Sequence, residues 1–194
     1  MSNVRAHLRV ARNALIAAVL LGGCTINSAS LSGQETAALA NPPPEVAKQL
    51  DELLPAATIW LNGVGEALGA TARKLTPDER HIASEAGVVE VERVRVALVE
   101  EMPMSENEPL RSAALQLGFA NKTLAGGTID HLIWLNRKHA QNRALLAHEL
   151  VHIAQQERMS QPAFLRRYFT ELAIMGYKRS PIEAEANQFM LRYK

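Results

Sequence analysis

The sequence contains very little cysteine: Cys24 is the only one among 194 residues. A single thiol cannot form a disulfide within the chain, so a disulfide-stapled secreted scaffold is excluded. With 47% hydrophobic residues, the chain is long enough and apolar enough to bury a core without such links. We therefore expect one domain that folds through ordinary hydrophobic packing.

The sequence also lacks an excess of charge of either sign. It has 21 Lys and Arg residues against 20 Asp and Glu residues. A nucleic-acid-binding domain normally carries clustered basic charge, and a disordered chain combines low hydrophobicity with a large net charge. Neither pattern is present, so we expect a folded protein with no nucleic acid among its partners.

Long hydrophobic runs are scarce near the N-terminus. The apolar run of residues 14–21 is far shorter than the about 20 residues that a membrane-spanning helix needs. It follows three arginines and ends close to Gly22 and Gly23. A basic segment, a short apolar segment and small residues, in this order, are typical of a secretory signal peptide. We expect residues 1–23 to form one.

The end of this segment, Leu21-Gly22-Gly23-Cys24, resembles the lipobox of bacterial lipoproteins, from which Gly22 is the main departure. The resemblance implies cleavage before Cys24 and lipidation of its thiol. It also implies a membrane anchor on the periplasmic side of a bacterial cell envelope, where we expect the outer membrane. The alternatives are an ordinary signal peptide with an incidental cysteine, or an anchor that stays uncleaved.

Composition divides the rest of the chain into two parts. Residues 24–44 are rich in Ser, Ala and Thr, end in three prolines and show no apolar periodicity. Such a segment is predicted to be a flexible tether. Residues 45–194 are predicted to form the globular domain.

Apolar periodicity predicts an α+β domain that is mostly helical with a small β-sheet. Residues 126 and 127, both glycine, predict a turn just before the second strand. The predicted helices cover residues 45–54, 56–74, 76–87, 111–117, 138–158 and 162–175, and a last one runs from 181 to the C-terminus. The predicted strands cover residues 88–99 and 128–135.

The motif that carries chemistry is His148-Glu149-Leu150-Val151-His152, in which two histidines stand four residues apart. Residues four apart share one face of a helix, so both imidazoles can reach one cation. Glu149 is offset by one residue and can instead reach a metal-bound water, where it would act as the general base. The alternative is a buried helix with two hydrogen-bonded core histidines.

The motif is followed by Gly176-Tyr177 and by the sequence SPIEAEAN at residues 180–187. Together these residues resemble gluzincin-type metallopeptidases, and more narrowly short bacterial proteins of the HELxH…PxExEA kind. The resemblance covers about residues 76–194. It implies a zincin-like domain, a catalytic zinc ion, and a β-sheet whose edge strand precedes the helix with the two histidines. It also implies a third zinc ligand, a glutamate on a later helix, for which Glu183 matches the spacing.

Two readings of Glu183 remain open. Ser180 and Glu183 also form a capping box, which stabilises a helix start without any metal. Glu185 is the competing third ligand. Glu183 and Asn187 border the apolar face of the predicted helix, whereas Glu185 lies nearer to solvent. We favour Glu183 as the ligand and place Asn187 beside it as a supporting residue.

A peptidase also needs a group that stabilises the developing oxyanion. Tyr177, Tyr168, His131 and His139 are the candidates, and we choose Tyr177 because it occupies the family-like Gly-Tyr position. Its alternative role is to pack the helix junction. For His131 we expect an exposed position on the second strand.

These residues predict zinc-dependent hydrolysis of peptide bonds, in a peptide or protein substrate, at the bacterial cell envelope. Residues 128–135 are predicted to be the edge strand that holds an extended substrate. A zinc amidase acting on peptidoglycan and a non-catalytic, zinc-stabilised scaffold lipoprotein remain as alternatives. Glu149 argues against the scaffold, because a structural zinc site needs no base and is normally closed by a fourth protein ligand. The oligomeric state stays open.

Overall fold

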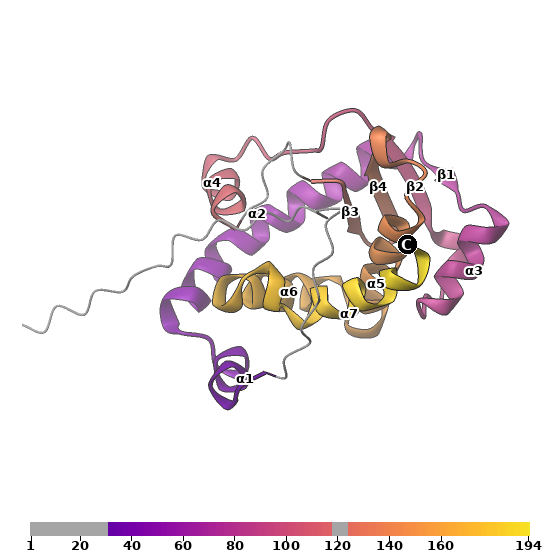
Figure 1. The fold of residues 1–194 in the computed structure, drawn as a ribbon. Helices are drawn as coiled ribbons and strands as arrows, with labels where there is room; N and C mark the ends of the chain where they lie inside the picture. The colour runs from indigo at the N-terminus through magenta and orange to yellow at the C-terminus, as the bar shows by residue number, and fades with distance from the viewer. Residues whose placement is uncertain (1–30, 118–123) are drawn as a thin grey trace, which may run out of the picture.

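A computed structural model describes residues 31–117 and 124–194. The predicted signal peptide and the lipidation site Cys24 lie outside the described residues. The described chain is mostly helical and contains one small mixed sheet, which confirms the expected α+β class (Figure 1). Within these ranges, no helix combines the length and the apolar character needed to cross a membrane.

The helices pack on both sides of the sheet (Figure 1). They are α1 (Gly33–Ala40), α2 (Pro44–Gly69), α3 (Pro77–Glu85), α4 (Glu108–Gln116), α5 (Arg143–Met159), α6 (Gln161–Met175) and α7 (Pro181–Met190). The strands are β1 (Arg73–Lys74), β2 (Arg95–Val99), β3 (Gly126–Ile129) and β4 (Leu132–Asn136). Single 3-10 turns lie between or after them: η1 (Val91–Arg93), η2 (Arg137–His139), η3 (Tyr177–Arg179) and η4 (Leu191–Tyr193).

The sheet has the strand order β1-β2-β4-β3. The central strands β2 and β4 are parallel, and the outer strands β1 and β3 pair antiparallel with them. β3 and β4 form a hairpin, with Thr128 opposite Ile133. Within the described residues, β3 is therefore an edge strand, and it also contacts α5. The sequence predicts an edge strand over residues 128–135, but only residues 128 and 129 of this range lie on β3, and the strand directly before the histidine helix is the interior strand β4.

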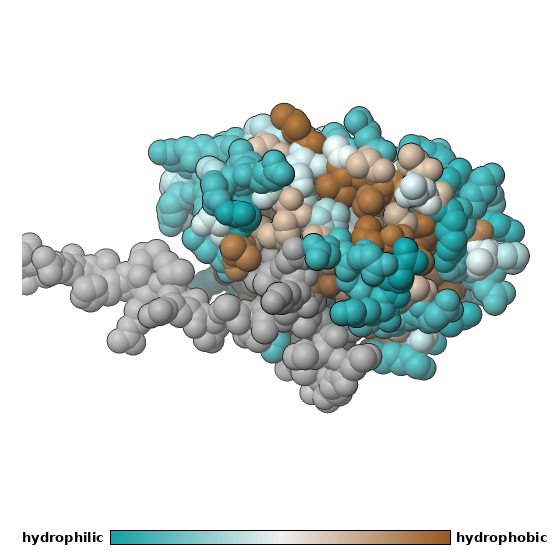
Figure 2. All heavy atoms as spheres, turned by 90° about the horizontal axis from the view of Figure 1, so that it is seen from above, coloured by the Kyte–Doolittle hydropathy of each residue, from teal (hydrophilic) through white to brown (hydrophobic). Residues whose placement is uncertain are grey.

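Alternate residues of the strands supply two hydrophobic cores, one on each face of the sheet. On one face, Val96, Ile133 and Leu135 pack with α3 and α5. On the other face, Ala97 and Trp134 pack with α2 and α6. The view from above shows hydrophobic residues gathered in the middle of the molecule with hydrophilic residues around them (Figure 2).

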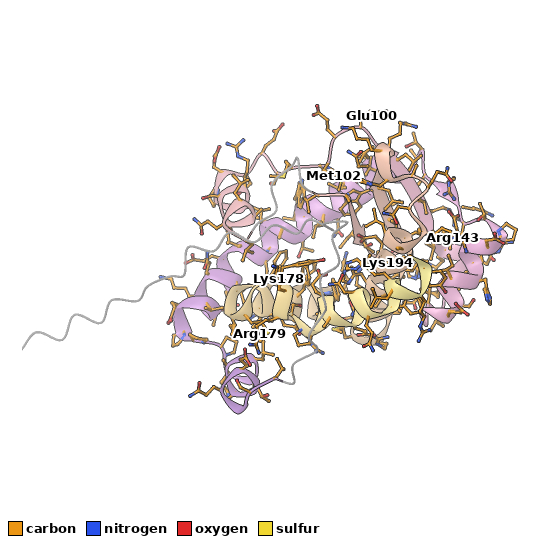
Figure 3. All side chains as sticks on the ribbon, in the orientation of Figure 1. Glu100, Met102, Arg143, Lys178, Arg179 and Lys194 are labelled. Carbon is orange, nitrogen blue, oxygen red and sulfur yellow. The ribbon has the colours of Figure 1, made fainter. Side chains whose placement is uncertain are left out.

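Helix α5 lies at the centre of the domain. Its N-cap is Asn142, whose side chain accepts a hydrogen bond from Leu145 N at 3.0 Å. Every residue from 144 to 156 is buried, because α3, α6, α7 and the sheet surround the helix. Arg143 stands at its start, beside α3, and lies 3.8 Å from Asp78 (Figure 3). The two histidines of the motif are thus carried by a helix with packing on all sides.

The prediction of two helices before residue 75 is wrong in its boundaries. α2 continues through Pro55, and its second predicted part stops before β1. A proline inside a helix removes one hydrogen bond and costs about 3 kcal/mol. Burial of Leu50, Ala57, Leu61 and Val64 along one face offsets this cost. The long-range packing of α2 therefore overrides the local proline signal.

The prediction of one strand over residues 128–135 is also wrong. The chain turns at Asp130, which has a positive φ of 48°, so β3 ends there and β4 runs back inside the sheet. Aspartate tolerates this conformation, but it is a weaker turn signal than glycine. Gly126 and Gly127 do not form the predicted turn. They lie in β3, where a Cβ on Gly127 would come within 2.6 Å of the Trp134 ring.

Two further boundaries differ from the prediction. The strand expected over residues 88–99 begins only at Arg95, because η1 precedes it. The segment expected to be a tether contains α1, which begins with a capping box of Ser32 and Glu35. Arg179, after α6, pairs with Glu35 at 2.8 Å and ties α1 to the domain (Figure 3). Local Ser, Ala and Thr composition conceals this helix.

Candidate metal centre

Helices α5 and α7 together build the candidate metal centre. α5 presents His148 and His152 on one face, as their spacing predicts, and α7 packs along α5. Glu183 lies in the first turn of α7, and its backbone N–H donates to the N-cap oxygen of Ser180 at 3.2 Å. Ser180 therefore caps α7, but the predicted capping box is not closed, because the backbone N–H of Ser180 donates to Tyr177 O and not to the Glu183 carboxylate. That carboxylate lies beside the histidines instead.

Three side chains converge in the buried space between the two helices. His148 Nε2 lies 3.0 Å from His152 Nε2 and 3.3 Å from Glu183 Oε2, and His152 Nε2 lies 3.7 Å from Glu183 Oε1. Their exposed fractions are only 4%, 7% and 2%. Atoms at about 2.1 Å from a tetrahedral ion lie roughly 3.4 Å apart. The three groups could therefore hold one metal ion.

Unsatisfied polar atoms mark the same place. Among the described residues, only two buried side-chain atoms have no hydrogen-bond partner: Glu183 Oε2 and His148 Nδ1. A buried carboxylate oxygen without a partner is costly, and such atoms need a physical explanation. A cation between the imidazoles would satisfy Glu183 Oε2. The donor set thus fits a metal by its chemistry as well as by its spacing.

The electrostatics of the cluster favour positive charge. Burial alone would raise the pKa of Glu183, but His148, His152 and the Tyr168 hydroxyl outweigh burial and lower it to about 2. Burial lowers the pKa of His148, whereas Glu183 and Glu149 raise it above its ordinary value. The carboxylates therefore stabilise a positive charge at the imidazole face, and a metal cation would replace the proton there.

Gln155 fixes the orientation of His152. The Gln155 Oε1 atom lies 2.8 Å from His152 Nδ1, and Gln155 Nε2 donates to Ile182 O at 3.0 Å and to Glu185 Oε2 at 2.9 Å. A proton on Nδ1 leaves Nε2 free to bind a cation, which is the usual support of a histidine ligand. Glu185 also pairs with Arg158 at 2.6 Å. The geometry therefore brings Glu183, and not Glu185, to the histidines.

Glu171 holds the start of α7 in place. This residue of α6 is completely buried, and its carboxylate accepts hydrogen bonds from Ser180 Oγ at 2.7 Å and Ile182 N at 2.9 Å. Arg167 Nε donates to its other oxygen at 2.9 Å. The contact fixes the helix turn that carries Glu183. No sequence pattern indicates it, because the partners come from different helices.

Tyrosines border the cluster. The Tyr168 hydroxyl donates to Glu183 Oε1 at 2.7 Å, and its ring stacks on Phe164. Tyr177, in η3, is half-buried, and burial together with the Glu183 carboxylate raises its pKa well above the ordinary value. The Asn187 side chain also affects both neighbours: it contributes to raising the pKa of His148 and acts to lower the pKa of Tyr177. The structure thus brings Tyr177 and Asn187 to the site, and adds Tyr168 as a direct partner of Glu183.

The Glu149 carboxylate contacts the edge strand β3 and is not part of the ligand cluster. Thr128 Oγ1 donates to Glu149 Oε2 at 2.6 Å. Glu149 is 5% exposed, and it is not one of the three groups that converge on the metal position. Glu149 therefore lies apart from the three groups that the sequence predicts as ligands, and its role as a base stays a prediction. Sequence reasoning missed Thr128, because it read residues 128–135 only as a strand.

A second group of ionisable side chains lies elsewhere along α5. His131 was expected to be an exposed strand residue, but it is buried in the turn between β3 and β4. Its Nε2 atom lies 2.9 Å from Glu157 Oε1, and its Nδ1 atom lies 2.9 Å from Asp130 Oδ1. Glu90, His131 and Glu157 also lie close enough for a metal. Their contacts, however, are ion pairs and backbone hydrogen bonds within the protein.

His139, the fourth oxyanion candidate, lies in η2 before α5. Among the described residues, the groups close enough to share an ion with His148 do not include His139.

Comparison of the whole chain with protein-family models, with curated proteins and with solved structures finds no match. What the protein does is therefore inferred from the side chains of this site.

Proposed function

We propose that the protein is a zinc-dependent peptidase in which His148, His152 and Glu183 hold the ion and Glu149 is the general base. One observation carries the proposal: three ligand atoms converge in a buried site, and one of them, Glu183 Oε2, has no hydrogen-bond partner among the described residues. A fully satisfied hydrophobic core would not leave such an atom.

Zinc suits this donor set better than other common ions. Imidazole nitrogen favours zinc, copper, iron and nickel, whereas magnesium and calcium prefer sites made only of oxygen. Two histidines and one glutamate form a known ligand set of catalytic zinc. Three protein ligands leave a position for water or substrate, which a structural site closes with a fourth ligand. The proposal therefore assigns a catalytic role to the ion.

The chain supplies the proton transfers of hydrolysis. A bound zinc ion would act as a Lewis acid that polarises the scissile carbonyl and makes water more acidic. Glu149 takes one proton from the water as its oxygen bonds to the carbonyl carbon, and passes this proton to the nitrogen as the C–N bond breaks. The products are a carboxylic acid and an amine. Tyr177, or its neighbour Tyr168, donates a hydrogen bond to the developing oxyanion.

The finer assignment of the fold as zincin-like is part of this proposal. Its support is that the edge strand β3 contacts the helix that carries the histidines. A substrate segment could pair with such an edge through backbone hydrogen bonds. Only residues 126–129 lie on this strand, and not the whole predicted segment.

The proposed place of action is the periplasmic side of a bacterial cell envelope. Its support is the lipobox-like sequence that ends at Cys24, together with the basic and short apolar segments before it. Growth of cells with a labelled fatty-acid analogue checks it. The wild-type protein should carry the label and the Cys24→Ser variant should not. Equal labelling of both proteins would contradict the anchor.

The test of function uses purified full chain with zinc added, an unfolded protein as substrate, and the Glu149→Gln variant. Both proteins should contain zinc, because residue 149 is not a ligand. Wild type should cleave the substrate, and the variant should be slower by at least about 10²–10⁴-fold, which is the usual contribution of a general acid–base. Cleavage by the zinc-loaded variant at the wild-type rate would refute the role of Glu149.

The same purified wild type distinguishes the alternative functions. Release of peptides from purified cell wall, with protein substrates left intact, would favour the amidase. Zinc binding without either activity would favour the scaffold.

A further inference from the structure

The general base proposed above is held by a single side chain from another element. Thr128 of β3 donates its hydroxyl proton to Glu149 Oε2 at 2.6 Å. The same hydroxyl lies 3.4 Å from the backbone oxygen of Glu149. A hydrogen bond of this length to a carboxylate is among the stronger ones in proteins. Glu149 is therefore tied to the edge strand and not only to its own helix.

The register of the β-hairpin places Thr128 for this contact. Because Thr128 pairs with Ile133, it lies on the face of the sheet that packs against α5. Gly126 stands two residues earlier on the same face. A Cβ there would lie 3.0 Å from Glu149 Oε1 and 3.0 Å from Leu135 Cδ2. The two carboxylate oxygens thus meet two different groups: Oε2 meets a hydroxyl donor, and Oε1 meets bare backbone.

We propose that Thr128 is a positioning residue that selects which oxygen of Glu149 takes the proton, an inference that rests on the proposed peptidase function. The terminal torsion of a glutamate is soft, so a carboxylate without a partner rotates over a broad range. Donation from Thr128 to Oε2 fixes this rotation. Oε1, to which no described residue donates a hydrogen bond, then remains free to take the proton.

This arrangement serves the distance requirement of general-base catalysis. A general base must lie within about 2.6–3.2 Å of the group whose proton it removes. Small errors in such positioning are costly, and displacement by about 1 Å can reduce a rate by about a hundredfold. Thr128 touches neither substrate nor ion in this scheme. It acts through Glu149, so its loss should reduce the rate of turnover and leave substrate binding unchanged.

The experiment compares Thr128→Val with Thr128→Ser in the zinc-loaded full chain, with an unfolded protein as substrate. Valine keeps the shape and the strand preference of threonine but lacks the donor, whereas serine keeps the donor. We expect kcat of the valine variant to fall about 10–100-fold, as for other partners that orient a reacting group, with KM and zinc content unchanged. The serine variant should restore kcat to within about threefold of wild type. A valine variant with wild-type kcat, or one that loses zinc or changes only KM, would overturn the inference.

A double variant separates this inference from the proposed function. If Thr128 acts through Glu149, Thr128→Val should not reduce the rate further when Glu149→Gln is already present. A second cycle compares the unfolding midpoints of wild type, Thr128→Val, Glu149→Ala and their double variant, and it needs no activity. Alanine replaces glutamine here because a glutamine amide oxygen would still accept the Thr128 hydrogen bond. A double variant that loses less than the sum of the single losses supports the contact. Inactive wild type with such coupling would refute the peptidase function and leave only the Thr128–Glu149 contact, whereas active wild type without coupling would refute the positioning role alone.

Discussion

Two clusters of histidine and carboxylate lie along α5, and they differ in how completely their atoms are satisfied. In the first cluster, His148, His152 and Glu183 face one another, and Glu183 Oε2 has no hydrogen-bond partner. In the second cluster, Glu157 accepts hydrogen bonds from the backbone of residues 89 and 90 and also contacts His131. Its other carboxylates, Glu90 and Asp130, pair with Arg93.

The difference shows that proximity of ligand-type residues is a weak sign of a metal. A cluster whose charges already neutralise one another through ion pairs has little need for an ion. A buried cluster in which an oxygen lacks a hydrogen-bond partner gains more from an ion, because desolvated polar atoms without partners are costly. We therefore assign the ion to the first cluster and a structural role to the second, which fastens the hairpin turn to α5.

The largest expected effect comes from removal of the third ligand. Glu183→Ala should lose most of the bound zinc, because two imidazoles alone hold the ion weakly in the remaining site. Glu185→Ala is the matched control from the same helix and should keep zinc, since Glu185 contacts Gln155 and Arg158. Metal analysis of both purified proteins gives the answer.

The same measurement can break the comparison between the clusters. Glu157→Gln should leave the zinc content of the protein unchanged, because Glu157 belongs to the ion-paired cluster. Loss of zinc in this variant, with Glu183→Ala unaffected, would reverse the assignment. If only the Glu185→Ala variant loses zinc, Glu185 and not Glu183 is the third ligand.

The next effect concerns the support of α7. Glu171→Ala leaves the buried Ser180 hydroxyl and Ile182 N–H without their acceptor, so it should lower the free energy of unfolding by about 2–4 kcal/mol. Zinc binding should weaken as well, since the turn that carries Glu183 loses its anchor. Arg166→Ala removes an exposed ion pair from the same helix and should cost less than about 1 kcal/mol. Urea denaturation measures both values, and similar losses would show that Glu171 has no special role.

The smallest effect tests the second cluster by its pH dependence. Burial raises the pKa of Glu157, but the backbone N–H groups of residues 89 and 90 and the His131 ring outweigh burial and keep it below the usual carboxyl value. A carboxyl with a lowered pKa stabilises the fold above its unfolded pKa of about 4.5 and stops doing so as the pH falls through the folded value. Glu157→Gln should therefore cost about 1.5 kcal/mol near pH 7 and less near pH 3.5. A pH-independent cost would contradict a charged role for Glu157.

The sequence indicates the local part of the site well. His148, Glu149 and His152 lie within two turns of one helix, so their spacing alone determines which of them share a face. Glu183 follows from the apolar face of α7, because an amphipathic pattern shows which carboxylate can point inward. The mainly helical class follows in the same way. These predictions need only the period of a helix.

The rest of the site depends on which segments meet in space. Thr128, Gln155 and Glu171 act across element boundaries, and their sequence contexts resemble those of ordinary strand or helix residues. The hairpin was missed because Asp130 takes a positive φ where no glycine marks the turn. α2 was divided at Pro55 because local sequence does not show the packing that keeps the helix whole. Long-range contacts decide each of these cases.

The enclosure of α5 has a consequence for amide hydrogen exchange. Every residue from 144 to 156 is buried, and the helix has neighbours on the sheet side and on the helix side. Amides in such a segment exchange with solvent only when the whole domain opens, whereas segments at an edge exchange through small local openings. We therefore expect the amides of His148 and His152 to be among the slowest to exchange in the described part of the chain. We expect the amides of the short edge strand β3, which carries Thr128, to exchange sooner.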